Sequence, residues 1–272
     1  MNFDVMELAG ILRDAARAEA VSRFRRLDAS MVTTKTSAID LVTEADVATE
    51  QAILARISEW LPEALFVGEE SVAADPALLG RLADADLAVV VDPIDGTANY
   101  AAGLPLFACM AAVVSKGETV AGIIYDPMGD DWVIAEKGSG TWLRRPNGEA
   151  VRLQVGKPQP LEEMVGMASL AYMPAKSRPQ ILQNTSKVRL VSNYRCAGHE
   201  YRTFVSGHGQ FVCYNKLMPW DHLPGVLISQ EAGAYAARLD GSDYLPSHVD
   251  GGLLVAIDRD GWAALRQHVF TF

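Results

Sequence analysis

Cysteine is scarce in this sequence. Cys109, Cys196 and Cys213 are the only three in 272 residues, and no pair has the C-x-x-C spacing of a redox or zinc motif. This scarcity argues against a disulfide framework and against a cysteine-rich zinc cluster. We expect buried or idle thiols at these positions.

Long apolar runs are also missing. No uninterrupted apolar stretch reaches the roughly 18 residues of a membrane span. Residues 1–7 carry acidic side chains where a secretory signal would carry Lys or Arg. Because 49% of the residues are nevertheless hydrophobic, the chain can bury a substantial core. We expect a cytoplasmic globular protein without membrane contact.

Positive charge is in deficit. Lys and Arg number 24 against 34 Asp and Glu, which gives a net charge of −10 at pH 7. Nonspecific nucleic-acid binding needs a basic face to meet the phosphates, so a nucleic acid is a disfavoured partner. Acidity is compatible with a small phosphate ester when bound cations supply positive charge locally. The placement of the carboxylates therefore decides which chemistry is available.

The most informative segment is 92–97, Asp-Pro-Ile-Asp-Gly-Thr, which directly follows an apolar run. The run predicts a buried strand that ends in acid. Carboxylates three residues apart at a sharp turn offer the oxygen ligands that hard divalent cations prefer. Pro93 fixes the local backbone, Gly96 allows it to approach a ligand closely, and Thr97 adds a hydroxyl.

Apolar periodicity predicts helices over Asp4–Leu27 and Thr43–Trp60 in the N-terminal part. Strands are predicted there at 64–67, 108–115, 119–125, 132–136 and 140–143. A Pro/Gly-bearing connection at 155–160 marks a soft boundary. Strands at 165–170, 188–192 and 209–214 then alternate with helices near 179–185, 197–206 and 222–231.

These patterns predict an α/β protein, with an α+β N-terminal half and an α/β C-terminal half. No linker or repeat divides the chain. We therefore expect a single domain, 1–272, whose halves of about 1–155 and 156–272 pack together around a cleft.

Two further acidic segments are weak signals when taken alone. Residues 67–71 place Glu69 and Glu70 after a short apolar strand, but such pairs are commonly solvated. Asp221 opens an amphipathic helix, where an N-cap is the ordinary interpretation.

Taken together and in order, segments 67–71, 92–97 and 220–222 resemble the inositol monophosphatase family of magnesium-dependent, lithium-sensitive phosphomonoesterases. Residues 35–46 resemble the family's N-terminal segment ahead of its second helix. The resemblance spans nearly the whole chain. It implies a layered αβαβα sandwich, hydrolysis of a small-molecule phosphomonoester, and a homodimer.

The resemblance also implies roles for individual residues. It assigns the metal ligands as Glu69, Asp92, Asp95, Asp221 and the carbonyl of Ile94. Glu70 would lie just behind them, and the first half of the chain would hold about two or three Mg²⁺ ions. Catalysis would involve Glu69 together with Thr97 and Asp46, the pair that helps to activate the attacking water. Asp46 has a second interpretation, since Thr43-x-x-Asp46 fits a helix capping box, and the two roles are compatible.

The physical argument agrees with these roles. Four converging carboxylates repel each other, so without metal their pKa values would rise or the site would open, whereas Mg²⁺ would neutralise them. One cation would lower the pKa of a bound water and another would stabilise the leaving alkoxide, with no covalent phosphoenzyme. The amides of Gly96 and Thr97 are expected to hold phosphate oxygens.

The second half of the chain, the expected substrate wall, departs from the family. Inositol-preferring members have a Gly-Ser/Thr-Ala stretch where this chain has residues 195–197, and a glutamate that holds inositol hydroxyls where it has Tyr214. Losing that carboxylate while gaining Arg195 and Lys216 favours a substrate with extra negative charge or an aromatic portion. The expected substrate contacts are Gly96, Thr97, Arg195, Cys196, Ala197, Tyr214 and Asp221.

Alternatives stay open at this point. The substrate of a related enzyme could be adenosine 3′,5′-bisphosphate (a 3′-nucleotidase), histidinol phosphate or fructose bisphosphate. A regulatory RNA- or protein-binding member of the fold is a rival of another class, for which 23–26 is the only compact basic segment. Cations at a helix C-terminus explain that segment more simply. His199 is expected at the substrate edge or on a helix surface, and His222 as a solvated or capping residue.

Overall fold

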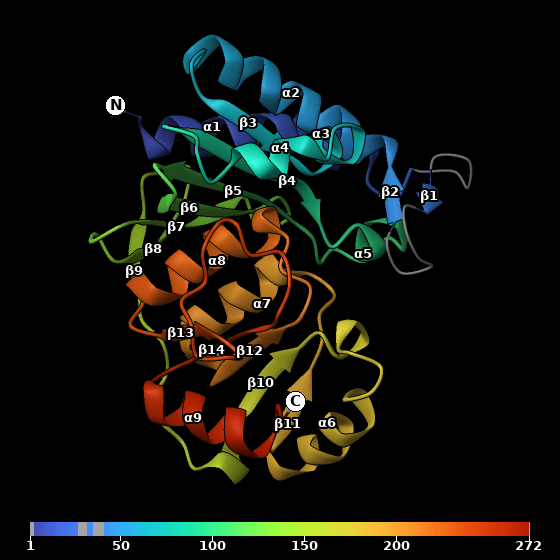
Figure 1. Ribbon diagram of the computed structural model, residues 1–272. Coiled ribbons are helices and arrows are strands. Elements are labelled where there is room, and N and C mark those ends of the chain that lie inside the picture. Colours follow the sequence, from blue (N-terminus) through green and yellow to red (C-terminus); the bar gives the residue numbers. More distant parts are fainter. Residues whose placement is uncertain (1–2, 27–31, 35–40, 272) are drawn as a thin grey trace.

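The computed structural model describes residues 3–26, 32–34 and 41–271, and layers of helix and sheet alternate through it (Figure 1). The larger sheet has seven strands in the order β3-β4-β5-β6-β7-β8-β9, with β3 and β4 parallel and all later neighbours antiparallel. Its strands are β3 (Leu65–Gly68), β4 (Ala88–Asp95), β5 (Ala108–Ser115), β6 (Glu118–Asp126), β7 (Asp131–Glu136), β8 (Thr141–Arg144) and β9 (Ala150–Leu153). The apolar β4 is buried along its whole length because helices cover both of its faces.

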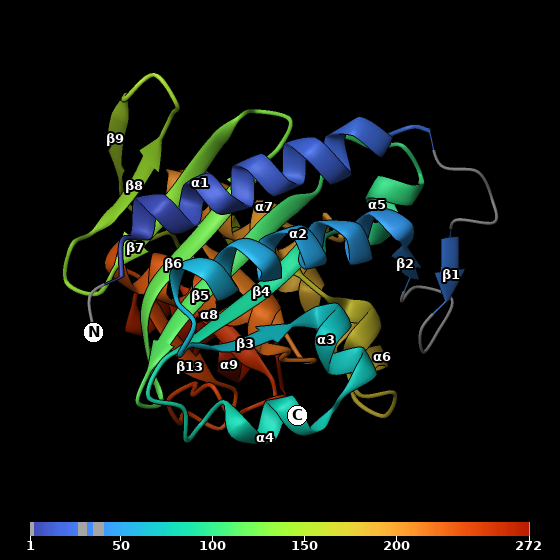
Figure 2. The ribbon, with the colours of Figure 1, turned by 90° about the horizontal axis from the view of Figure 1, so that it is seen from above.

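Helices α1 (Val5–Ala15) and α2 (Glu44–Trp60) cover one face of this sheet (Figures 1 and 2). A π-helical turn, Ala16–Val21, continues α1. The hairpin of β1 (Val32–Thr34) and β2 (Leu41–Thr43) leads into α2. The short helices α3 (Glu69–Ala74), α4 (Ala77–Arg81) and α5 (Thr97–Ala101) follow β3 and β4.

The opposite face of the sheet packs on α7 (Ala197–Thr203) and α8 (Pro219–Glu231), which separate it from a second sheet (Figure 1). The second sheet has five strands in the order β11-β10-β12-β14-β13. They are β10 (Val165–Ala168), β11 (Leu190–Ser192), β12 (Phe211–Tyr214), β13 (Tyr235–Arg238) and β14 (Leu253–Ala256). Helices α6 (Arg178–Asn184) and α9 (Arg259–His268) cover its outer face with an apolar cluster.

The predicted layered αβαβα architecture is confirmed by this arrangement. Helix α2 begins and ends where the sequence predicts, because Thr43 caps its first turn and Trp60 is its last residue. The first helix is shorter than the predicted 4–27, and residue 27 lies outside the described residues. Within the described ranges, no helix has both the length and the apolar character needed to cross a membrane.

Elements missed by the sequence analysis are mostly short or exposed. Strand β9 is exposed along most of its length, so it carries no apolar pattern. Strands β13 and β14 are short and pair with each other across a long loop, so tertiary pairing and not local periodicity defines them. Helix α9 is amphipathic and is capped by Asp258, so it was predictable from the local sequence and was missed.

Candidate active site

Three aspartates meet where β4 ends and α8 begins. Asp92 and Asp95 belong to β4, Asp221 lies in the first turn of α8, and one carboxylate oxygen from each lies within 4.8 Å of the others. In a regular strand, side chains three residues apart point to opposite faces. The pairing of β4 with β5 shifts register between Asp92 and Asp95, around Pro93. This irregularity allows both carboxylates to lie on the same side.

The aspartates carry more negative charge than a buried site tolerates. Burial raises the pKa of Asp92 and Asp95, and it raises the pKa of Asp221 to about 8. The charge of Glu69 and the mutual repulsion of the aspartates act in the same direction. A cluster of carboxylate oxygens under this strain fits a hard divalent cation such as Mg²⁺, which would favour the ionised forms.

Helix α7 holds Asp95 in place. Its carboxylate accepts hydrogen bonds from the N–H groups of Ala197 at 3.1 Å and Gly198 at 2.6 Å, and the Cys196 thiol donates to it at 3.0 Å. A Cβ on Gly198 would lie 3.1 Å from that carboxylate and 2.9 Å from the Ala108 side chain. Glycine at this position therefore allows the helix to approach β5.

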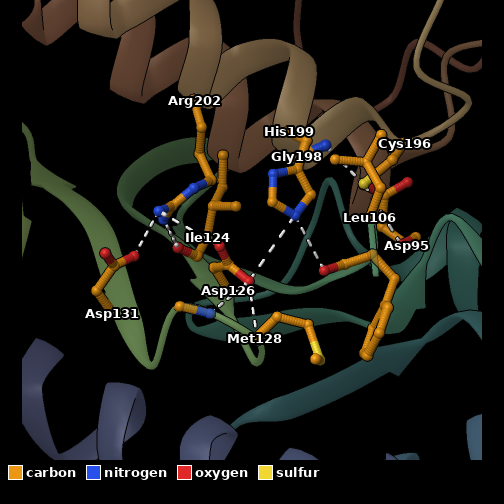
Figure 3. Close-up of polar contacts among 12 residues, drawn as sticks. Asp95, Leu106, Ile124, Asp126, Met128, Asp131, Cys196, Gly198, His199 and Arg202 are labelled. Atoms are coloured by element: carbon orange, nitrogen blue, oxygen red, sulfur yellow. Dashed lines mark hydrogen bonds and ion pairs between the residues drawn. The ribbon is translucent and has the colours of Figure 1, made fainter. Parts of the chain in front are cut away.

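A polar network anchors α7 to the larger sheet (Figure 3). Arg202 donates to the Ile124 carbonyl at 3.3 Å and forms an ion pair with Asp131. The Nε2 atom of His199 lies 3.2 Å from the Phe107 carbonyl oxygen. These contacts fix the helix whose first amides meet the aspartate cluster.

Glu69 is the first residue of α3, and its charge raises the pKa of each of the three aspartates. Glu50, buried on α2, accepts hydrogen bonds from the N–H groups of Glu70 and Ser71, each at 2.7 Å, and from the Ser71 hydroxyl. Glu50 thus caps the first turn of α3 and fixes the position of Glu69, its first residue. Glu50 is not among the predicted site residues, because nothing in its local sequence sets it apart from other helical glutamates.

The Thr97 hydroxyl lies 3.0 Å from Asp46 Oδ1 and 3.0 Å from the Ile94 carbonyl oxygen. The other oxygen of Asp46 accepts the Thr43 N–H at 2.8 Å, and a capping box is present. Asp46 therefore makes the contacts of a helix capping box and also the contact with Thr97 that the family resemblance implies. Burial raises the pKa of Asp46 to about 6, against the hydrogen bonds from Thr43 and Thr97. This carboxylate is ionised at neutral pH.

Gly96 joins β4 to α5 in the left-handed conformation, with φ of 88°. A Cβ there would lie 3.0 Å from the Cys196 side chain and 3.1 Å from the Leu106 carbonyl oxygen. Arg195 is also left-handed, with φ of 55°. Glycine adopts this left-handed conformation more easily than arginine does.

A cleft of about 440 Å³ opens on the aspartates. Glu69, Asp92, Ile94, Asp95 and Asp221 line it, and so do the expected substrate contacts Gly96, Thr97, Arg195, Cys196, Ala197 and Tyr214. Asp46, Glu70 and His199 are not among the described residues of its lining. Asp46 reaches the cleft through Thr97, and the Glu70 N–H bonds to Glu50.

Two residues of the cleft differ from expectation. Glu200 of α7 lines the cleft, so the substrate wall still holds a carboxylate although position 214 is tyrosine. His222 is buried, with Nδ1 near the Tyr201 hydroxyl at 3.2 Å and Nε2 near the Lys216 carbonyl oxygen at 3.0 Å. Burial lowers the pKa of His222 to about 3. The expectation of a solvated or capping histidine is wrong, since the ring packs inside the site.

The expectation for His199 is also wrong. Its side chain is 13% exposed and its ring lies between α7 and the larger sheet, near Asp126 (Figure 3). Burial lowers its pKa. It supports the helix and does not face the cleft.

Curated relatives cover most of this chain. Nus factor SuhB of Vibrio cholerae is 29% identical over 246 residues, 87% of this chain and 85% of the relative. The inositol-1-monophosphatase of Caulobacter vibrioides is 30% identical over 231 residues, 83% and 86% of the two chains. The fructose-1,6-bisphosphatase/inositol-1-monophosphatase of Thermotoga maritima is 30% identical over 210 residues, 77% and 75%.

A solved structure and a family model agree with these relatives. The extragenic suppressor protein SuhB from Bartonella henselae superposes with a TM-score of 0.81 at 25% identity, and the match covers 97% of this chain and 98% of the other. The model of the inositol monophosphatase family matches residues 5–268. The chain therefore belongs to the inositol monophosphatase family.

Proposed function

We propose that this protein hydrolyses a small-molecule phosphomonoester with Mg²⁺ as its cofactor. The observation that carries the proposal is the group of Asp92, Asp95 and Asp221, whose carboxylate oxygens converge within 4.8 Å at the wall of an open cleft. Their raised pKa values mark a site built to receive positive charge. Glu69 and the Ile94 carbonyl would complete the ligand set, since both line the same cleft.

The residues of the chain would divide the work as follows. When bound, Mg²⁺ would supply Lewis-acid stabilisation of phosphate charge and would lower the pKa of water. The Thr97 hydroxyl donates its hydrogen to Asp46 Oδ1. Its oxygen lone pairs therefore remain available to accept a hydrogen bond from a water molecule and to orient that water toward phosphorus. The backbone amides of Gly96 and Thr97 would hold phosphate oxygens.

The substrate class is the finer part of the proposal. Arg195 and Lys216 are exposed residues of the cleft that would favour a second anionic group on the substrate. Candidates are inositol phosphates, fructose bisphosphate, histidinol phosphate and adenosine 3′,5′-bisphosphate. Lithium sensitivity, a homodimer and a cytoplasmic location belong to the same proposal, since they rest on membership of the family.

Phosphate release from these esters, measured with Mg²⁺ or with EDTA, tests the proposal. We expect turnover that needs Mg²⁺ and falls at least about 100-fold in Asp92→Asn, because one ligand oxygen is lost. Asp240→Asn makes the same chemical change on an exposed loop and serves as the control. Turnover that persists in EDTA, or that Asp92→Asn leaves intact, would refute the proposal.

A binding function is the second candidate, because Nus factor SuhB is among the relatives. The basic segment 23–26 gives it little support. Arg23 pairs with Glu19, Arg25 donates to the Gly103 carbonyl at 2.9 Å, and Phe24 packs on Tyr100. RNA or protein binding that survives both EDTA and Asp92→Asn, in a protein without phosphatase activity, would favour this candidate.

A further inference from the structure

Asn99 of α5 joins two segments that are far apart in the sequence. Its side chain is 2% exposed, and its amide nitrogen donates to the Leu106 carbonyl at 2.9 Å and to the Tyr194 carbonyl at 2.7 Å. Both partners are carbonyl oxygens, so the nitrogen and not the oxygen of the amide faces them. The main chain of Asn99 is fixed as well, because its N–H donates to the Gly96 carbonyl at 2.8 Å. The side chain therefore cross-links the two segments, with both amide hydrogens in use.

The segments that Asn99 joins meet at the acidic turn. A Cβ on Gly96 would lie 3.1 Å from the Leu106 carbonyl oxygen and 3.3 Å from the Arg195 carbonyl oxygen. Segment 194–196 therefore packs against the turn whose amides are expected to hold phosphate. Arg195 of this segment lines the cleft, whereas Asn99 is not among the described residues of the lining. Any effect of Asn99 on the substrate thus passes through the residues that it holds.

The segment carries backbone strain at Arg195. Four non-glycine residues in the described ranges have a positive φ, and of these only Arg195, with φ of 55°, lines the cleft. A left-handed arginine persists only where its surroundings hold it. The Arg195 N–H donates to the Asn193 side chain at 2.7 Å. Glu200 accepts the N–H of Tyr194 at 2.8 Å, and Asn99 holds the carbonyl of the same residue.

We propose that Asn99 is a positioning residue for the proposed phosphatase reaction. It holds segment 194–196 against the acidic turn and thereby keeps Arg195 at the cleft. The inference rests on the proposed function and adds a residue to it. Loss of the cross-link should leave the metal site intact, because the first amides of α7 hold Asp95 directly. It should release one wall of the cleft, so that substrate binding weakens while metal binding does not.

A purely structural role is the competing explanation, since a buried amide that satisfies two acceptors stabilises any fold. Asn184 of α6 provides a matched control. It is 4% exposed, and its amide nitrogen donates to the Val269 carbonyl at 3.2 Å and to the Thr271 hydroxyl at 3.0 Å. It is not among the described residues that line the cleft. Leucine has nearly the shape of asparagine and no donor, so Asn99→Leu and Asn184→Leu remove the same chemistry at two places.

Steady-state phosphate release, calorimetric titration with Mg²⁺ and thermal unfolding compare the two variants with wild type. We expect Asn99→Leu to raise KM about 10-fold or more, because a small displacement of a positioning wall has a large effect. The dissociation constant of Mg²⁺ should stay near that of wild type. Asn184→Leu should lower the melting temperature without changing KM. An unchanged KM in Asn99→Leu, or the same change of KM in both variants, would overturn the inference.

The strain at Arg195 provides a second test that needs no turnover. Arg195→Gly should stabilise wild type more than it stabilises Asn99→Leu, because the backbone of the latter is free to relax. The effect of glycine on the unfolded chain is common to both backgrounds and cancels. Denaturant unfolding of wild type, the two single variants and the double variant measures this coupling. We expect the unfolding constant to show a coupling of about 2- to 10-fold. Additive effects would show that Asn99 does not hold Arg195, and would overturn the inference.

A smaller change covers the case in which leucine prevents folding. Asn99→Ser keeps one donor on a shorter side chain, and Asn184→Ser is its control. The same measurements apply to this pair, with the same direction expected for KM, for the affinity of Mg²⁺ and for the coupling with Arg195→Gly. A rise of KM in Asn99→Ser that Asn184→Ser does not share supports the positioning role, and its absence refutes it.

Failure of the phosphatase proposal would be visible separately. If the wild type released phosphate from no ester, calorimetric titration with inorganic phosphate in the presence of Mg²⁺ would replace the measurement of KM. Weaker phosphate binding in Asn99→Leu than in Asn184→Leu would uphold the positioning role without catalysis. Equal affinities in the two variants would refute the positioning role. A wild type that neither hydrolyses the esters nor binds phosphate would refute both proposals.

Discussion

At the residue scale, the Thr97 hydroxyl connects Asp46 on α2 to the acidic turn that follows β4. It lies 3.0 Å from both Asp46 Oδ1 and the Ile94 carbonyl oxygen. We expect Thr97→Val to lower kcat about 100-fold or more, because general acid–base catalysis contributes roughly 10²–10⁴-fold and the Thr97 hydroxyl would connect the attacking water to Asp46. The valine is nearly isosteric, so the fold should be kept, but the melting temperature should fall modestly because Asp46 Oδ1 loses its hydrogen-bond donor.

Thr97→Ser is the rescue variant for this prediction. It keeps the hydroxyl and should retain most of the kcat that Thr97→Val loses. Steady-state phosphate release for the two variants, with thermal unfolding alongside, makes the measurement. Equal losses of kcat in both variants would show that the methyl group, and not the hydroxyl, matters.

The same scale shows what the sequence could and could not reveal about the site. The acidic turn at 92–97 was predictable from the sequence, because an apolar strand, two aspartates and a glycine follow one another there. Glu50 and Glu200 gave no such signal. Each is one glutamate within a helix, and tertiary packing alone brings it to α3 or to the cleft. Tyr214 suggested that the substrate wall had lost its carboxylate. The sequence does not show that Glu200 reaches the same wall from another element.

At the scale of elements, α3 depends on a cap that comes from α2. The Glu50 carboxylate accepts the N–H groups of Glu70 and Ser71, and a Cβ on Gly68 would lie 2.3 Å from it. We expect Glu50→Ala to weaken Mg²⁺ binding about 10- to 100-fold, as loss of supporting hydrogen bonds does at metal sites. Displacement of Glu69 is the physical reason.

Calorimetric titration of the metal-free protein with Mg²⁺ measures this effect without relying on turnover. The Mg²⁺ affinity of Glu50→Gln should lie between those of wild type and Glu50→Ala, because the glutamine keeps one acceptor oxygen and loses the other. Glu59→Gln changes an exposed glutamate of the same helix and is the control. Wild-type Mg²⁺ affinity in Glu50→Ala would show that α3 holds Glu69 without its cap.

Element prediction succeeded where the local pattern and the tertiary environment agreed. Helix α2 has a capping box at Thr43 and apolar periodicity that ends at Trp60, and both ends were predictable. Strands β5 and β6 are long and apolar. Strand β9 is exposed and β13 pairs across a loop, so neither the burial nor the pairing that defines them was visible locally.

At the scale of the whole molecule, the chain packs its layers around a set of carboxylates that oppose folding. The pKa of Asp92 and of Asp95 is raised by burial, and that of Asp221 rises to about 8. Where a folded-state pKa exceeds the unfolded value of about 3.9, the native state binds more protons than the unfolded state, so stability falls with rising pH. The cleft therefore exists at a cost to stability that its ligand is expected to offset.

The metal-free protein should consequently lose stability as the pH rises from about 4 to about 8, and Mg²⁺ should restore it most strongly at the upper end. At about 100 times its dissociation constant, Mg²⁺ should contribute about 2.7 kcal/mol to the free energy of unfolding.

Asp92→Asn removes one of the repelling groups. Without metal it should be at least as stable as wild type at pH 8, and it should gain little from Mg²⁺. Other groups, such as Asp46, titrate in both proteins, so the wild-type minus variant difference isolates the cluster. Denaturant unfolding at several pH values, with EDTA or Mg²⁺, measures that difference. If it did not change with pH, or if Mg²⁺ stabilised both proteins equally, repulsion among these carboxylates would not be what the cation relieves.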